Sequence, residues 1–181
     1  DHWQRRDDVR HRHRAVQIDL AALPDDPAVL RRMLQEVVPE LQAENEKLWG
    51  KVWQAACRVE EIPKVGDYVT YDILDESIVV VRSAKDRIQA FYNVCQHRGQ
   101  RLLDGPRGKA NAFRCKYHAW TYRLDGSLRT VLDLEVFSQG LDLEQLGLPE
   151  IRVDTWGGLV WICFDPDAEP SGTVRIGGFA T

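Results

Sequence analysis

The stretch CQHRG at residues 95–99 and the stretch CKYHAW at residues 115–120 decide how this chain folds and what it holds. Each stretch contains one cysteine followed closely by one histidine, and residues 98–114 separate the two pairs. Thiolate and imidazole groups are strong ligands for transition metals. Two such pairs in the same order therefore predict two facing loops with a metal centre between them.

The four ligand candidates match the requirements of a Rieske-type 2Fe-2S cluster, in which two histidines replace two cysteines on one of the irons. Cys95 and Cys115 are the predicted thiolate ligands, and His97 and His118 are the predicted imidazole ligands. With neutral imidazoles the oxidised centre carries a charge of about zero, compared with about −2 for four thiolates. An electron is easier to add to the less negative centre, so we expect a site for electron transfer without a catalytic acid or base.

A structural zinc site is the alternative for two cysteines and two histidines. Zinc fingers usually group cysteine with cysteine and histidine with histidine, whereas each stretch here supplies one of each. A disulfide between Cys95 and Cys115 would leave the neighbouring His97 and His118 without a function. The cluster is therefore the preferred interpretation of the pattern.

The two stretches, with Tyr122 and the turn sequence Asp125-Gly126, resemble the Rieske domain of the large (alpha) subunit of aromatic ring-hydroxylating oxygenases. Lys116 stands where that family commonly has proline, and Ala119 where it commonly has glycine. The resemblance implies a mainly β fold, an antiparallel Rieske-type sandwich with cluster-binding loops and an N-terminal helical extension.

The resemblance also implies an oxidoreductase function. The cluster would accept electrons from a ferredoxin or reductase and pass them to a mononuclear non-haem iron, which hydroxylates an aromatic substrate in the catabolism of aromatic hydrocarbons. The complete protein would be a homotrimer or an α3β3 assembly. A stand-alone Rieske-type ferredoxin, or the small subunit of a reductase, is the alternative.

The mononuclear Fe(II) site of the family needs two further histidines and a carboxylate. No histidine follows His118, and the others, His2, His11 and His13, lie in an arginine-rich arm. We therefore expect the mononuclear iron in a catalytic domain outside this sequence, and the chain to be part of a longer subunit.

Respiratory Rieske proteins carry an additional disulfide between the two ligand loops. The corresponding positions here are Gln100 and Tyr117, and Trp120 replaces a serine that bonds a cluster sulfide in those proteins. Fewer hydrogen bonds to sulfur predict a reduction potential toward the low end of the Rieske range, near about −150 mV.

Composition and charge agree with a cytoplasmic protein of this kind. The chain has 181 residues, a net charge of −4 and a pI near 5.7, which disfavours nucleic-acid binding. No stretch reaches the length of a membrane span, about 18 apolar residues. Cys57 and Cys163 lie in apolar runs and are expected to be buried free thiols.

The pattern along the chain predicts three parts. Residues 1–50 form an arm and helices, with one helix over 28–38, an interruption at Pro39 and a second helical piece over 40–49. Residues 51–165 form the Rieske domain, and residues 166–181 begin a linker or catalytic domain. The expected strands are 52–58, 68–74, 77–82, 88–94, 112–115, 120–124 and 159–164.

Two aromatic residues lie within the second ligand stretch, and two more lie in the terminal strand region. Tyr117 and Trp120 flank His118 and are expected to shield the cluster or pack beside it. Trp156 and Trp161 are expected in the core.

Overall fold

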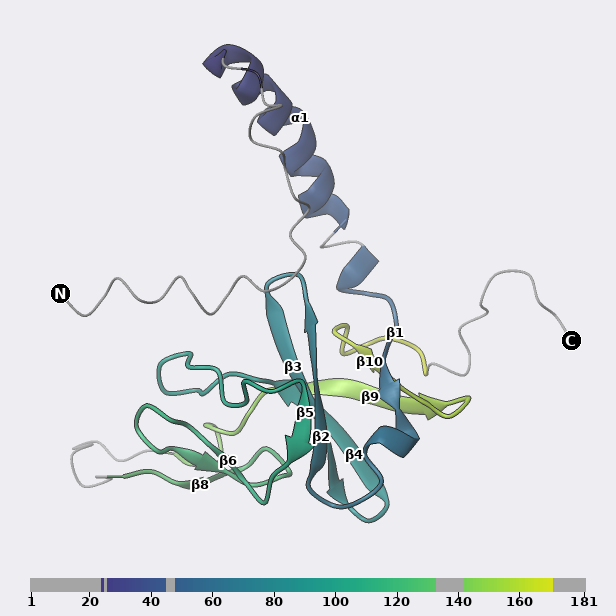
Figure 1. Ribbon diagram of the computed structural model, residues 1–181, viewed down its shortest axis with the longest axis vertical. Coiled ribbons are helices and arrows are strands. Elements are labelled where there is room, and N and C mark those ends of the chain that lie inside the picture. The colour runs from purple at the N-terminus through teal and green to yellow at the C-terminus, as the bar shows by residue number, and fades with distance from the viewer. Residues whose placement is uncertain (1–23, 25, 45–47, 133–141, 171–181) are drawn as a thin grey trace, which may run out of the picture. The chain divides into compact units, whose positions relative to one another are not determined.

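The computed structural model describes residues 24, 26–44, 48–132 and 142–170 (Figure 1). These residues fall into two units, one that ends at Trp49 and one that begins at Gly50. The first contains a helix, and the second contains antiparallel strands. The predicted mainly β fold with an N-terminal helix is confirmed.

Helix α1 (Pro27–Glu44) begins where the sequence predicted. Asp26 caps its first turn, because the Asp26 carboxylate accepts a hydrogen bond from the Ala28 amide at 2.8 Å. The expected interruption at Pro39 is wrong, since Pro39 lies inside the helix. Proline removes one backbone donor and crowds one preceding turn, and the helical turns on both sides continue. Among the described residues, no helix is both long and apolar enough to cross a membrane.

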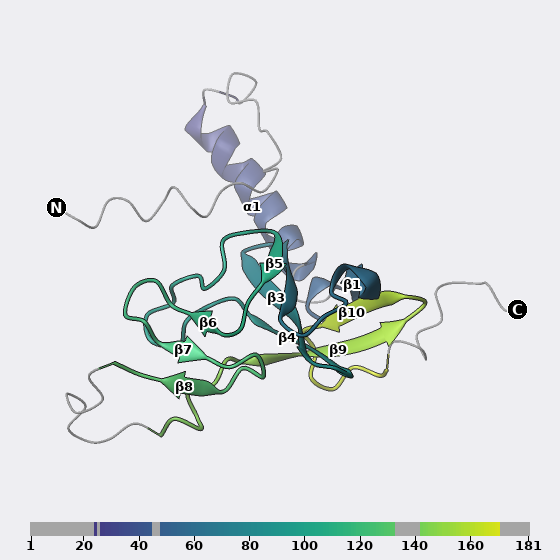
Figure 2. The same cartoon turned by 60° about the horizontal axis from the view of Figure 1, so that its bottom comes forward.

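The second unit contains a seven-stranded sheet and a three-stranded sheet, whose paired strands all run antiparallel. The large sheet has the order β1 (Gln54–Arg58), β10 (Leu159–Cys163), β9 (Glu150–Trp156), β4 (Arg87–Tyr92), β3 (Glu76–Ala84), β2 (Asp67–Ile73) and β5 (Arg107–Lys109). The small sheet contains β6 (Phe113–Arg114), β7 (Thr121–Tyr122) and β8 (Leu128–Thr130). Both views place the small sheet and the β9–β10 hairpin on opposite sides of the central strands (Figures 1 and 2).

Three strands were not predicted: β5, β8 and β9. β5 has the sequence Arg-Gly-Lys and all three residues are exposed, so it carries no apolar pattern. Its backbone is held by pairing with β2. The position of such an edge strand is determined by its pairing with the neighbouring strand and not by a pattern in its own residues.

Strand β3 is covered on both faces, because Ile78, Val79, Val80 and Val81 are all completely buried. Alternate side chains of a strand point to opposite faces. Val79 and Val81 pack into a core that also contains both ligand cysteines, while Ile78 and Val80 pack into a second core. The large sheet therefore has a buried core on each face, and the candidate site belongs to one of them.

Cys57 and Cys163 are buried free thiols, as the sequence predicted. Both pack in the second unit, and Cys57 belongs to the core without the ligand cysteines. Burial, with the nearby Glu61 carboxylate, raises the pKa of the Cys57 thiol to about 11. Burial also raises the pKa of Cys163. Both side chains are therefore protonated and unreactive near neutral pH.

Candidate metal centre

The two ligand loops close with the same pair of backbone hydrogen bonds. In each loop the cysteine N–H donates to the carbonyl five residues later, and the residue four positions later donates back to the cysteine carbonyl. The bonds are Cys95 to Gln100 at 2.8 Å, Gly99 to Cys95 at 2.9 Å, Cys115 to Trp120 at 2.8 Å and Ala119 to Cys115 at 3.0 Å. The two stretches of sequence thus form turns with the same backbone hydrogen-bond pattern.

Both turns need a residue with positive φ at their fifth position. Gly99 has a φ of 69° and Ala119 has a φ of 56°. Glycine adopts this left-handed region without penalty, whereas a residue with a Cβ atom is strained by about 1 to 2 kcal/mol. Ala119, one of the two departures from the family pattern, therefore keeps the backbone shape of the loop at some cost in stability.

The structure brings the four predicted ligands together. Cys95 and Cys115 are 2% and 3% exposed, and both lie in the same core cluster. The imidazole rings of His97 and His118 lie edge to face, with ring centroids 4.6 Å apart. Each loop thus contributes one cysteine to the buried side of the predicted site and one histidine to the other side.

The buried ring nitrogens of the histidines fit metal ligands. Nδ1 of His97 and Nδ1 of His118 are both buried and have no hydrogen-bond partner. A buried polar atom without a partner costs free energy, so these two atoms are explained by a group that they would coordinate. The donor set, two thiols and two bare imidazole nitrogens, matches a Rieske cluster.

The pairing of the ligands also bears on the zinc alternative. Among the described residues, no three His, Cys, Asp or Glu side chains are placed to hold one metal ion. A structural zinc site needs four ligands around one position. Each iron of a Rieske cluster takes only two protein ligands, so the arrangement supports the binuclear centre.

Aromatic rings cover the two imidazoles unequally. The Trp120 ring stacks on His97 with ring centroids 4.8 Å apart and an interplanar angle of 8°. Trp120 is buried, as expected for a residue that shields the site. Tyr117 lies against His118 with ring centroids 3.8 Å apart, but it is 55% exposed. Tyr117 therefore covers the His118 ring from the surface of the protein, whereas Trp120 covers the His97 ring from the core.

The environment favours neutral imidazole at His97. Burial lowers the pKa of His97, and electrostatic repulsion from the nearby His118 and Arg98 side chains lowers it further. A histidine must be deprotonated at the nitrogen that binds a metal. The protein thus favours the protonation state that a ligand needs.

Tyr122 contacts the site, although the sequence alone predicted no role for its side chain. Its hydroxyl oxygen lies 3.3 Å from Cys95 Sγ and accepts a hydrogen bond from the Gln96 amide at 3.0 Å. Since the amide occupies the oxygen as an acceptor, the hydroxyl proton is available to a Cys95 thiolate. Burial and the Cys95 contact raise the pKa of Tyr122, which keeps this proton in place. Alternation with buried Trp120 is the signal in the sequence that places Tyr122 on the inner face of β7.

Replacing Tyr122 by phenylalanine is expected to lower the reduction potential of the cluster. A hydrogen bond to a ligand sulfur stabilises the more negative, reduced state, so its loss disfavours reduction. If this hydrogen bond is about 1 kcal/mol stronger in the reduced state than in the oxidised state, its loss corresponds to about 40 mV for a one-electron couple. A redox titration followed by visible absorption measures the shift.

The matched control is Tyr71→Phe, which removes a hydroxyl that bonds Gln54 and packs against the other core. This control should leave the potential unchanged. A Tyr122→Phe protein with the potential of the parent would contradict the proposed hydrogen bond.

Comparison with known proteins agrees with this geometry. Residues 52–138 match the family described as the Rieske [2Fe-2S] domain. The carnitine monooxygenase oxygenase subunit of Escherichia coli is 38% identical over 125 residues, which cover 69% of this chain and 33% of that protein. The large oxygenase component of a naphthalene 1,2-dioxygenase system from Pseudomonas aeruginosa is 36% identical over 129 residues, 70% of this chain and 29% of that protein.

Solved structures show the same similarity. A naphthalene 1,2-dioxygenase variant bound to phenanthrene superimposes with a TM-score of 0.69 at 34% identity, covering 73% of this chain and 30% of that chain. A quaternary ammonium Rieske monooxygenase gives a TM-score of 0.66 at 37% identity, covering 71% of this chain and 37% of that chain. The chain spans about a third of the length of the curated relatives it matches.

Proposed function

Since residues 52–138 form a Rieske [2Fe-2S] domain related to those of oxygenase large subunits, we propose that this chain is the electron relay of a Rieske non-haem iron oxygenase. The observation that carries the proposal is the pair of buried, unpartnered Nδ1 atoms of His97 and His118 beside two buried free cysteines. The relatives described above are large oxygenase subunits, which favours a relay over a stand-alone ferredoxin.

In this proposal the four side chains divide the binding task. The thiolates of Cys95 and Cys115 would hold one iron, and Nδ1 of His97 and of His118 would hold the other. When bound, the cluster supplies reversible transfer of one electron. Trp120 excludes water from one face of the His97 ring, and Tyr122 donates a hydrogen bond to Cys95.

The imidazoles are the proposed route for electrons between the site and a partner. Both rings remain partly exposed although their Nδ1 atoms are buried. The cysteines, by contrast, are enclosed in the core. A ferredoxin or reductase donor, and then the mononuclear iron of a catalytic domain, would therefore approach the histidine side.

The remaining features of the complete enzyme belong to the same proposal. Residues 1–50 would form the N-terminal extension, 51–165 the cluster domain and 166–181 the start of the connection to a catalytic domain. The subunits would assemble as a homotrimer or an α3β3 complex in the cytoplasm, a reducing compartment that suits four free cysteines. The relatives are named for substrates as different as carnitine and naphthalene. Such a range is consistent with a common electron-transfer domain. The aromatic substrate remains a prediction, and it concerns the catalytic domain.

Anaerobic purification followed by spectroscopy tests the proposal. The protein should contain about two irons per chain, absorb visible light and give a paramagnetic signal after one-electron reduction, with a potential nearer about −150 than about +300 mV. A correctly folded protein that is colourless and contains zinc would overturn it.

A further inference from the structure

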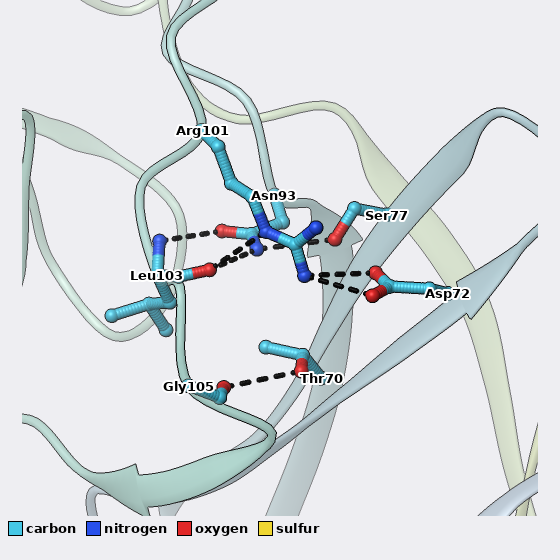
Figure 3. A network of polar contacts seen from close by, with 7 residues as sticks. All are labelled: Thr70, Asp72, Ser77, Asn93, Arg101, Leu103 and Gly105. Atoms are coloured by element: carbon cyan, nitrogen blue, oxygen red, sulfur yellow. Dashed lines mark hydrogen bonds and ion pairs between the residues drawn. The ribbon is translucent and has the colours of Figure 1, made fainter. Parts of the chain in front are cut away.

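The segment after the first ligand loop is attached to the large sheet by a charged pair (Figure 3). Nη2 of Arg101 donates to both carboxylate oxygens of Asp72 on β2, at 3.0 and 2.9 Å. The two side chains are only 25% and 21% exposed. A partly buried pair is screened by salt much less than a surface pair, so this attachment persists in ordinary buffers.

The backbone of Leu103 forms three hydrogen bonds with two side chains (Figure 3). Its N–H donates to Asn93 Oδ1 at 2.9 Å, and its carbonyl accepts from Asn93 Nδ2 at 2.8 Å and from Arg101 Nε at 2.9 Å. Asn93 is 1% exposed and also donates to Ser77. We call Asp72, Asn93 and Arg101 the clasp, because Asn93 and Arg101 hold the Leu103 backbone and Asp72 holds Arg101.

The clasp closes the base of the first ligand loop. Asn93 lies two residues before Cys95, and Leu103 lies six residues after His97. Backbone pairing between Val94 and Arg101 spans the same base. The position of the loop relative to the sheet is therefore set where the loop begins and ends.

Asp104 directly follows Leu103, whose backbone the clasp holds. The Asp104 carboxylate forms an ion pair with the Lys116 ammonium group. Lys116 belongs to the second loop and directly follows Cys115. This ion pair thus connects the two ligand loops side chain to side chain.

The connection has no covalent counterpart, since all four cysteines lie in the described part of the chain and are free. Building on the relay function above, we propose that the clasp positions Asp104 so that its ion pair with Lys116 holds the two ligand loops together in place of a covalent cross-link. The members of the clasp are positioning residues and do not contact the cluster. Exposed ion pairs add little to overall stability, so the role is to fix the separation of the loops.

The first test replaces Lys116 by methionine, which is unbranched and one atom shorter and carries no charge. Iron release to a chelator is measured on the cluster-loaded protein, together with the line width of the paramagnetic signal after reduction. Release should be about two- to fivefold faster, the factor expected for one exposed ion pair, and the signal should broaden because the loop separation varies. The matched control is Lys85→Met in the turn between β3 and β4, which should behave as the parent protein.

Salt supplies a second readout. Raising the salt from about 0.1 to about 1 M shortens the Debye length from about 10 Å to about 3 Å, which screens the exposed pair. Iron release from the parent should therefore accelerate with salt, and release from Lys116→Met should not. Equal release and equal line widths for Lys116→Met and Lys85→Met would overturn the inference.

The contribution of the clasp is tested with the double variant Asp72→Asn/Arg101→Gln, which removes both charges at similar size. It should release iron as fast as Lys116→Met, and adding Lys116→Met should produce no further acceleration. Independent effects that multiply in the triple variant would overturn the link between clasp and ion pair. If the double variant does not fold, the Lys116→Met comparison alone decides. An iron-free parent protein would overturn the relay function as well, whereas an iron-loaded parent with unchanged variants overturns this inference alone.

Discussion

Replacing Cys115 by serine is expected to yield a folded protein without a 2Fe-2S cluster. Each iron takes only two protein ligands, so losing one thiolate removes half of the protein's hold on that iron. A serine hydroxyl stays protonated near neutral pH and is a poor substitute for a soft thiolate ligand. Iron should fall from about two per chain to nearly zero, and the paramagnetic signal of the reduced protein should disappear.

The matched control makes the same chemical change at Cys163. That thiol is also buried, but its Sγ lies 3.5 Å from the Lys51 carbonyl. Cys163→Ser should therefore keep its iron and its spectrum. Iron analysis and spectroscopy of both variants decide the matter, and full iron content in Cys115→Ser would remove Cys115 from the ligand set.

Replacing Gly126 by alanine is expected to destabilise the domain by about 3 kcal/mol. Gly126 has a φ of 83°, and a Cβ atom there would lie 2.5 Å from Cε1 of the buried Phe91 ring. The Phe91 side chain is 1% exposed and cannot move into solvent without opening the core. Strained backbone and an overpacked core therefore act together. Denaturant unfolding measures the loss of free energy.

Gly157 supplies the control for this prediction. It has a φ of 62°, but a Cβ atom there would meet nothing within 4 Å. Gly157→Ala should thus cost only the backbone strain, about 1 kcal/mol. Equal losses for the two alanine variants would show that the Phe91 contact does not determine the effect.

The motif and the apolar runs were enough to predict the fold and the four ligand candidates. The ligands are close in sequence within each loop, and the buried strand residues such as Val79 and Val81 form an evident β pattern. The clasp was not predictable in the same way. Asp72 and Arg101 are 29 residues apart, and only the pairing of strands brings them together.

The tryptophans show the same limit. Trp156 was expected in the core, and this is wrong, since it is 51% exposed. It ends β9 directly before the Gly157-Gly158 turn, and its ring packs beside Trp161 at a centroid distance of 6.2 Å. An apolar residue at the tip of a hairpin has too few neighbours to be enclosed. Its position in three dimensions, and not its hydrophobicity, determines its exposure.

Because β3 is buried on both faces, it separates the domain into two apolar cores. One face of the strand supports the residues that would hold iron, and the other face supports a separate apolar interior with its own thiol, Cys57. We expect substitutions in that interior to leave the ligand loops in place, because the strand itself stands between the two cores. The core around Cys57 is therefore the place where a spectroscopic label is expected to disturb the predicted ligands least.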